Sequence, residues 1–175
     1  MERIRPRGRV TGVSDQKSDD LESFYSATYA KIVGGLVFVA GSRASAEDAV
    51  QEAFVRLVPR WQKVANYDDP VAWVRRVAFN IVVDRKRVAS RRILKLTVPT
   101  VRHHEDEYPS ESGLQMALNG LSPLHRQVLV LRFIHDLSVD QIAHELGISP
   151  GTVKSRLSRA RSAVENNLHE ESNHV

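Results

Sequence analysis

A segment near the C-terminal end places cationic and small side chains together on one face of a predicted helix. The cations are Lys154, Arg159 and Arg161, and the small residues are Gly151, Ser155, Ser158 and Ser162. Such cations can bind phosphates or the edges of guanine bases, and small residues let a helix backbone approach a groove. The opposite face is apolar at helical spacing, with Val153, Leu157, Ala160 and Val164. This pattern predicts non-covalent DNA recognition.

The residues just before this helix carry the signals of a preceding helix and a tight turn. Ser138 is an N-cap that Gln141 can complete as a capping box, and Gly147 can supply the left-handed conformation that ends a helix. Ser149 and Pro150 then suit the start of the second helix. We therefore predict a helix-turn-helix over residues 138–161. An ordinary helical hairpin with a solvated basic face is the alternative, and the agreement among independent signals favours DNA binding.

A second group of polar and cationic residues lies on and before a predicted helix that begins at Asp69-Pro70. Asn80 and Asp84 are four residues apart and share a face. The surrounding cations are Arg75, Arg76, Arg85, Lys86 and Arg87, and the preceding loop holds Asn66, Tyr67, Asp68 and Asp69. This combination can follow a phosphate backbone and receive an unstacked base. Trp73 is in phase with Val77 and Ile81, which predicts that its ring belongs to the core.

A third group is acidic. Buried positions at helical spacing around Ala49 and Ala53 leave Glu47, Asp48, Gln51 and Glu52 on one surface. A solvated helix face normally mixes charges of both signs, whereas this one has a single sign. The pattern is compatible with an ordinary solvated surface and with docking on a basic protein surface.

The composition excludes several other functions. The 175 residues have a net charge of +4 and no cysteine, so disulfides and cysteine-based zinc sites are excluded. His103 and His104 lack the spacing of helical metal ligands, so we predict neither a metal nor a cofactor. No nucleophile, acid–base pair or phosphate loop is recognisable, which predicts that the chain is not an enzyme. We also expect no membrane span and no signal peptide, and hence a cytoplasmic protein.

The spacing of apolar residues predicts an all-α chain of two small helical domains joined by a flexible linker. We expect a disordered basic extension at 1–18, a first domain at 19–92, a linker at 93–113, a second domain at 114–168 and a tail at 169–175. In the first domain we expect a helix over Asp20–Ala40, a second helix capped by Ser45, a loop over 59–69 and a third helix ending near Val88. The second domain should hold a short helix near 114–119 and one after Ser122-Pro123, whose apolar face is Val128, Leu131 and Ile134.

Three segments carry a family resemblance. AEDAVQEAF at Ala46–Phe54, PVAWVRRVAFNIVVDRKR at Pro70–Arg87 and SPLHRQVLVLRFIHDLSVDQIAHELGISPGTVKSRLSRAR at Ser122–Arg161 resemble the extracytoplasmic-function (ECF) sigma factors of bacterial RNA polymerase, within the sigma-70 family. They are similar, in order, to region 2.2, regions 2.3 to 2.4, and region 4. The resemblance extends from about Asp20 to Val164.

The resemblance implies a specificity subunit of RNA polymerase with three contact surfaces. Asp48, Gln51 and Glu52 would dock on the clamp helices of the beta-prime subunit, and the beta flap would be a further contact. The −10 element would be bound by Asn66, Tyr67, Asp68, Asp69, Arg75, Arg76, Asn80, Asp84, Arg85 and Arg87. The −35 element would be bound by Arg132, Thr152, Lys154, Ser155, Ser158, Arg159 and Arg161. An anti-sigma factor is the expected regulator.

Two other functions remain open at this point. A helix-turn-helix regulator of the LuxR type would explain Ser122–Arg161 nearly as well, but it gives the acidic helix face and the 80–87 segment no role. A protein-interaction module that mimics these domains would bind an anti-sigma factor without starting transcription.

Overall fold

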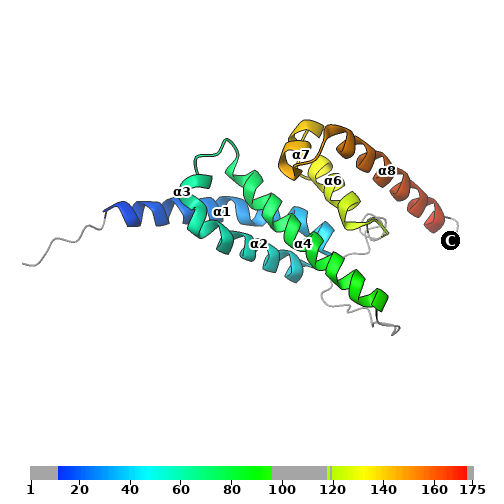
Figure 1. Ribbon diagram of the computed structural model, residues 1–175, viewed down its shortest axis with the longest axis horizontal. Helices are drawn as coiled ribbons and strands as arrows, with labels where there is room; N and C mark the ends of the chain where they lie inside the picture. Colours follow the sequence, from blue (N-terminus) through cyan, green and yellow to red (C-terminus); the bar gives the residue numbers. More distant parts are fainter. Residues whose placement is uncertain (1–11, 96–117, 119, 173–175) are drawn as a thin grey trace, which may run out of the picture.

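The protein is built from helices packed in two groups. The computed structural model describes residues 12–95, 118 and 120–172, and no strand occurs among them. The elements are α1 (Gly12–Ala40), α2 (Arg43–Leu57), a 3-10 turn η1 (Val58–Arg60), α3 (Trp61–Val64), α4 (Pro70–Lys95), α6 (Pro123–Phe133), α7 (Val139–Leu146) and α8 (Pro150–Ser172). Figure 1 shows the first five elements on one side and α6 to α8 on the other. The expected all-α fold is confirmed.

Helices α1, α2 and α4 form the first group, in which each helix packs against the other two. Their shared core includes Leu36, Val50, Leu57 and Phe79, each fully or almost fully buried. Trp73 is partly buried against this core, as its phase with Val77 and Ile81 predicted. Asp69 begins α4 as expected, because its carboxylate accepts a hydrogen bond from the Ala72 amide at 2.9 Å.

Helices α6, α7 and α8 form the second group, and their ends follow the signals in the sequence. Ser138 and Gln141 form the complete capping box at the start of α7. Gly147 ends that helix at φ 65°, in the left-handed region that glycine adopts without steric cost. The Ser149 hydroxyl then accepts a hydrogen bond from the Thr152 amide and starts α8. The predicted helix-turn-helix is therefore confirmed, with Val153, Leu157 and Ala160 buried beneath it.

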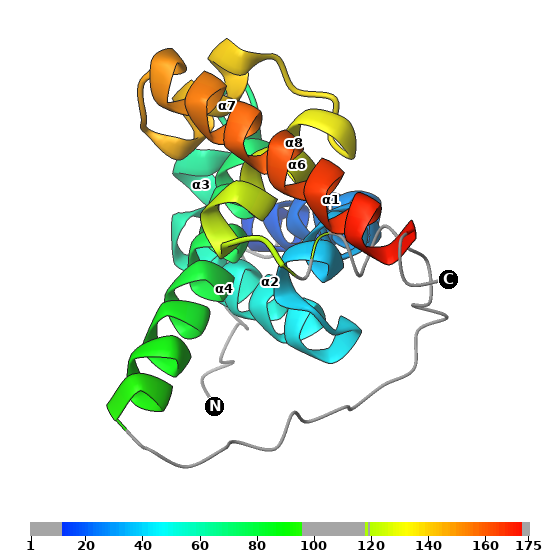
Figure 2. The ribbon, with the colours of Figure 1, turned by 90° about the vertical axis from the view of Figure 1, so that its right-hand side faces the viewer.

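The two groups pack against each other, which the sequence patterns did not predict. Helix α6 lies on α1 and α4, and α7 lies on α4; Figure 2 shows α6 to α8 stacked over the first group. The buried apolar residues of both groups belong to one continuous cluster. His135, which follows α6, sits at the junction with its ring edge-on to Phe79, 6.2 Å between centroids. A Cβ added to Gly35 of α1 would lie 2.2 Å from His135 Nε2, so only glycine fits beneath this ring.

Several predicted boundaries are wrong. Helix α1 begins at Gly12, inside the expected disordered extension, and α4 continues to Lys95, past Val88 and into the expected linker. Ser42 rather than Ser45 caps α2. The backbone of Ser42 is extended, and its hydroxyl accepts a hydrogen bond from the Ser45 amide. The expected loop over 59–69 contains η1 and α3. Residues 1–11 and 96–117, with the His103–His104 pair, lie outside the described residues.

Helix α1 also corrects the expectation about apolar segments. Its 21-residue Asp20–Ala40 portion has a mean hydropathy of 1.2 in an 18-residue window, so by length and composition alone it is apolar enough to cross a membrane. In the folded chain, however, Ile32, Leu36 and Val39 of this portion are buried in the core, where α1 contacts α2, α4 and α6. Packing against both groups of helices accounts for the buried share of this apolar window, which is 28%.

Candidate nucleic-acid interface

The outward face of α8 carries the polar residues that the sequence singled out. Lys154, Ser155, Ser158, Arg159 and Arg161 are all exposed, while Thr152 is half-buried. The hydroxyls of Thr152 and Ser149 are 2.8 Å apart, which fixes Thr152 at the first turn. Because the apolar face is buried against α6 and α7, the cationic face of α8 points to solvent. An exposed cationic face on the second helix of a helix-turn-helix is typical of a DNA-binding helix.

An open cleft of about 480 Å³ lies beside this face. It is lined by Arg132 of α6 together with Val139, Lys154, Leu157, Ser158, Arg161, Ser162 and Glu165. Arg132 donates a hydrogen bond to the Leu137 carbonyl at 2.9 Å, which holds the loop between α6 and α7. The Arg161 guanidinium stacks 5.4 Å from the centre of the Phe133 ring. Arg132, Lys154 and Arg161 therefore line one cleft, and cations of this kind are typical phosphate ligands.

Two further residues near this surface were not predicted from the sequence. The pKa of His125 is lowered, first by burial and then by the positive charges of Arg159 and Arg156. Arg156 thus adds to the positive potential on this side of α8. The sequence could have indicated this, because Arg156 lies three residues before Arg159 and such residues are neighbours on a helix surface.

A second polar stripe runs along α4. Arg76, Asn80, Asp84 and Arg87 recur at i, i+4, i+8 and i+11, and all four side chains are exposed. The loop before α4 exposes Asn66, Tyr67, Asp68 and Asp69. The Asn66 side-chain amide donates to the Gln62 carbonyl at 2.7 Å, so part of this loop is already ordered. The loop before α4 and the stripe along α4 therefore both present polar side chains to solvent.

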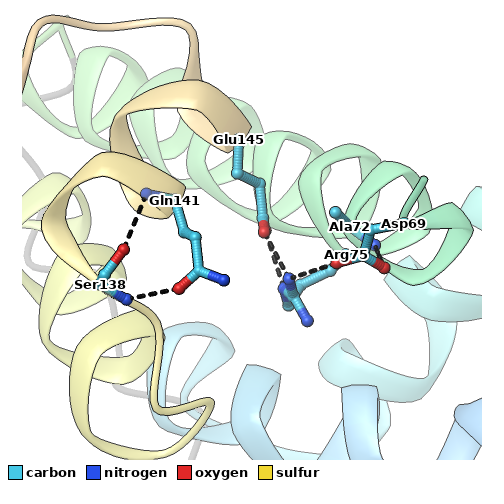
Figure 3. A network of polar contacts seen from close by, with 6 residues as sticks. All are labelled: Asp69, Ala72, Arg75, Ser138, Gln141 and Glu145. Carbon is cyan, nitrogen blue, oxygen red and sulfur yellow. Dashed lines mark hydrogen bonds and ion pairs between the residues drawn. The ribbon is translucent and has the colours of Figure 1, made fainter. Parts of the chain in front are cut away.

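Two of the predicted contacts to the −10 element are engaged elsewhere. Arg75 is only 5% exposed; its guanidinium donates two hydrogen bonds to Glu145 of α7, at 2.8 and 2.5 Å (Figure 3). The prediction that Arg75 lies on an open DNA-facing surface is wrong for this conformation. One residue of helix turns a side chain by about 100°, so Arg75 faces α7 while Arg76 faces solvent. Arg85 is paired with Glu52 of α2 at 2.7 Å.

The junction between the two groups perturbs several titratable residues. Burial raises the pKa of Glu145, and the hydrogen bond and charge of Arg75 act in the opposite direction. Burial lowers the pKa of His135 to about 4, with a smaller contribution from Arg75 and Lys31. Neither ring nitrogen of His135 has a hydrogen-bond partner within the described part of the chain. His135 is therefore a neutral packing residue at neutral pH.

The acidic face of α2 is less uniform than the sequence suggested. Asp48 and Gln51 are exposed as expected. Glu47, however, pairs with Arg43 at 2.5 Å, and Glu52 pairs with both Arg56 and Arg85. The expectation of a face with a single sign of charge is wrong, because it considered only the residues between Ala46 and Phe54.

Two exposed valines extend this face and were missed by the sequence reasoning. Val55 is 69% exposed and Val58 is 60% exposed, on α2 and η1 respectively. The signal was available, since Val55 follows Gln51 by four residues and so shares its side of the helix. An acidic and apolar surface of this kind suits a protein partner better than DNA.

Two family models match this chain, one over each group of helices. The model for Sigma-70 region 2 matches residues 24–92, and the model for Sigma-70 region 4 matches residues 112–164. The ECF RNA polymerase sigma factor SigL of Mycobacterium tuberculosis is 31% identical over 170 residues, 93% of this chain and 96% of SigL. The RNA polymerase sigma-E factor of Streptomyces antibioticus is 32% identical over 130 residues, 70% of each chain.

Among solved structures, the sigma factor RpoE in complex with the anti-sigma factor NepR, from Bartonella quintana, has a similar fold. The TM-score is 0.69 at 22% sequence identity, covering 86% of this chain and 98% of that one. A LuxR-type regulator is not favoured, because it leaves the region 2 match at residues 24–92 without an explanation. The two regions in order, with relatives similar over nearly the whole length, show that this chain belongs to the ECF sigma factors of the sigma-70 family and is an RNA polymerase sigma factor.

Proposed function

We propose that this chain binds core RNA polymerase and directs initiation at promoters whose −35 and −10 elements it reads with two separate surfaces. The observation that carries the proposal is the exposed stripe of Arg76, Asn80, Asp84 and Arg87 on α4, in the same chain as a complete helix-turn-helix. The protein performs no chemistry of its own in this proposal. It acts in the cytoplasm, where it supplies sequence specificity to the polymerase.

The −35 element is bound by α8 in the major groove. Lys154, Arg159 and Arg161 supply the cations for base edges and phosphates, and the serines between them permit close approach. Arg132 contributes a phosphate contact from across the cleft. Thr152 is held at the first turn by Ser149, where the N-terminal residues of a recognition helix meet the bases.

The −10 element is bound as an opened strand by α4 and the loop before it. Arg76 and Arg87 hold the phosphates, while Asn80 and Asp84 contact bases or sugars. Tyr67 is 41% exposed and offers a stacking surface for an unstacked base. Asn66, Asp68 and Asp69 surround this position with hydrogen-bonding groups. Arg75 and Arg85 join this surface only after they leave Glu145 and Glu52.

Core polymerase is bound by Asp48, Gln51 and Glu52, which we assign to the beta-prime clamp helices. The beta flap is assigned to an apolar groove of about 260 Å³ that includes Leu129, Phe133, Ile134 and Val164. Ile134 was expected on the buried face of α6, yet it is 45% exposed, and Phe133 is 58% exposed. Large exposed apolar side chains beside a groove are typical of a protein-binding surface.

An anti-sigma factor is the proposed regulator. The similar RpoE structure is a complex with such a factor, NepR. A protein that covers both Asp48–Glu52 and Lys154–Arg161 would compete with polymerase and with DNA for the same surfaces. Co-purification of the native chain from cells, followed by titration with core polymerase, tests this competition.

Run-off transcription with core polymerase and the purified chain tests the proposed function. Transcripts from a specific promoter, with no other sigma factor present, are the expected result. A requirement for the housekeeping sigma factor would indicate a LuxR-type regulator instead. Binding to an anti-sigma factor without any transcript would indicate an interaction module.

Substituting Lys154 or Arg159 by alanine should weaken −35 recognition and leave core binding intact. Loss of a base-reading cation costs about 1–3 kcal/mol and relaxes preference at one base pair, whereas loss of a phosphate contact weakens binding to all sequences. Arg43→Ala, which removes an exposed cation from α2, is the control. Binding of the holoenzyme to promoters mutated one base pair at a time distinguishes the two roles. Full activity of both variants on a promoter that depends on its −35 element would contradict the assignment of α8.

A further inference from the structure

A buried ion pair joins the two DNA-reading halves of the chain. Arg75 of α4 and Glu145 of α7 form two parallel hydrogen bonds, and their side chains are only 6% and 3% exposed. Figure 3 shows the Glu145 carboxylate pointing directly at the guanidinium, with Asp69 on the other side. The Asp69 carboxylate lies 3.8 Å from Arg75, too far for a strong second pair. Glu145 is therefore the principal partner of Arg75.

Polar and close-fitting contacts around this pair add to the apolar core that the two groups share. The Arg126 guanidinium of α6 reaches the Phe38 carbonyl of α1 at 3.4 Å. The His135 ring occupies the space left by the missing side chain of Gly35. A Cβ at Gly147 would lie 3.1 Å from the Arg76 guanidinium, so the helix-turn-helix turn rests on the DNA-facing stripe of α4.

This arrangement is incompatible with simultaneous contact to both promoter elements. Elements at −35 and −10 are about 25 base pairs apart, or ~85 Å along B-form DNA. In the chain, Arg76 lies against Gly147, and the seven residues to Lys154 span at most ~25 Å even when fully extended. The two DNA-binding surfaces must therefore separate before the chain can read a whole promoter.

We propose that Arg75 and Glu145 form a latch that holds the free chain in a closed, promoter-incompetent form. The proposal rests on the proposed function of the two surfaces. Glu145 occupies the position on Arg75 that a DNA phosphate takes when the halves separate, because a carboxylate and a phosphate bind the planar guanidinium fork in the same way. Closing the latch also brings Gly147 of the helix-turn-helix turn beside Arg76. DNA phosphates then compete with Glu145 for Arg75, and their binding favours the open form.

An ion pair suits this role because its strength depends on both partners being present. When two opposite charges are buried together, their attraction offsets the free-energy cost of removing them from water. A single charge left in the junction has no such compensation. Removing either partner therefore favours separation, which returns the remaining charge to water. An apolar contact of the same size would lack this dependence on a specific pair.

The first test measures the distance between the halves in the free, full-length chain. Because the sequence contains no cysteine, Ala44→Cys on α2 and Asn166→Cys on α8 can carry spin labels without background labelling. The labelled chain with no further substitution should give one narrow distribution of distances between the two labels. Glu145→Gln should broaden this distribution towards longer distances. The double charge swap Arg75→Glu with Glu145→Arg should restore the narrow distribution. Asp140→Asn, an exposed change on the same helix, is the control and should leave it unchanged.

A second pair of variants tests the junction without changing any charge. Gly35→Ala places a methyl group against His135, whereas Gly34→Ala, its neighbour in α1, has nothing within 4 Å. Both substitutions raise the helix propensity of α1 equally, so the two variants differ only in the contact with His135. Gly35→Ala alone should therefore lengthen the distance between the labels. Circular dichroism confirms that α1 and the other helices remain formed.

Binding of the free chain to a single-stranded −10 oligonucleotide gives the functional readout, because the latch withholds Arg75 from this strand while the core-docking residues Asp48 and Gln51 stay exposed. If wild type is about nine-tenths closed, opening by Glu145→Gln or Gly35→Ala should speed association with the oligonucleotide up to ~10-fold. An unchanged distance in both variants, or a broad wild-type distribution, would overturn the latch. Opening without faster association would overturn its inhibitory role. Absence of binding to the oligonucleotide in every variant, wild type included, would instead contradict the proposed function, while the distance result would stand.

Discussion

Reversing the charges of Asp48 and Glu52 together is expected to abolish binding to core RNA polymerase. Asp48 is exposed, and Glu52 is half-buried beside it on α2. Loss of a complementary charge contact costs about 1–3 kcal/mol, and each new arginine adds repulsion against a basic partner. Affinity should therefore fall at least ~100-fold. A pull-down with core polymerase, followed by titration, measures the loss.

The fold should survive this double substitution. Glu52 gives up its pairs with Arg56 and Arg85, but partly exposed pairs of this kind contribute only about 0–1 kcal/mol each. Glu22→Arg with Asp140→Arg makes the same change in net charge at exposed positions on α1 and α7, and it should bind normally. Retained binding by the Asp48 and Glu52 variant would show that polymerase docks elsewhere.

Replacing Phe79 by alanine is expected to produce the largest loss of stability. Phe79 is fully buried in α4, and its ring meets His135 from the other half of the chain. Truncation of a buried phenylalanine lowers the free energy of unfolding by about 3–5 kcal/mol, because apolar contacts are lost and a cavity remains. Urea unfolding followed by circular dichroism measures the change.

Val88→Ala on the same helix is the matched control. Val88 is 47% exposed, so its truncation should change the free energy of unfolding by less than about 0.5 kcal/mol. Hydrogen exchange adds a second measurement, because α6 and α7 should lose protection together with α4 in the Phe79 variant. A loss confined to α1, α2 and α4 would contradict the shared core.

Much of the local structure follows from the sequence for simple physical reasons. The capping box of Ser138 and Gln141 and the left-handed Gly147 involve only residues a few positions apart, so their signals are complete in the chain. The buried face of α8 follows from helical periodicity in the same way, since Val153, Leu157 and Ala160 lie on one side whatever the helix packs against. The cations of α8 are then left on the outer face.

The boundaries that failed depended on competition between neighbouring signals. Ser42 and Ser45 are both good caps, and the extended backbone of Ser42 decides between them. Helix α1 starts before Asp20, at Gly12, and α4 continues beyond Val88 to Lys95, because no glycine or proline occurs in residues 13–19 or 89–95. Helix propensity then extends both helices past the apolar pattern that revealed them.

The ion pairs between helices depend on the tertiary structure. Periodicity places Glu52 on the outer side of α2, but its pairing with Arg85 depends on how α4 lies beside α2. Arg75 and Arg76 are adjacent in sequence and identical in chemistry. Arg76 remains on the exposed stripe, while Arg75 is buried against Glu145, 70 residues away. The sequence by itself determined the all-helical fold, the caps of α7 and the exposed polar faces of α8 and α4, because these depend on nearby residues. Only the packing of α6 and α7 onto α1 and α4 decided which charges remain open to DNA, because that packing depends on contacts between residues far apart in the chain.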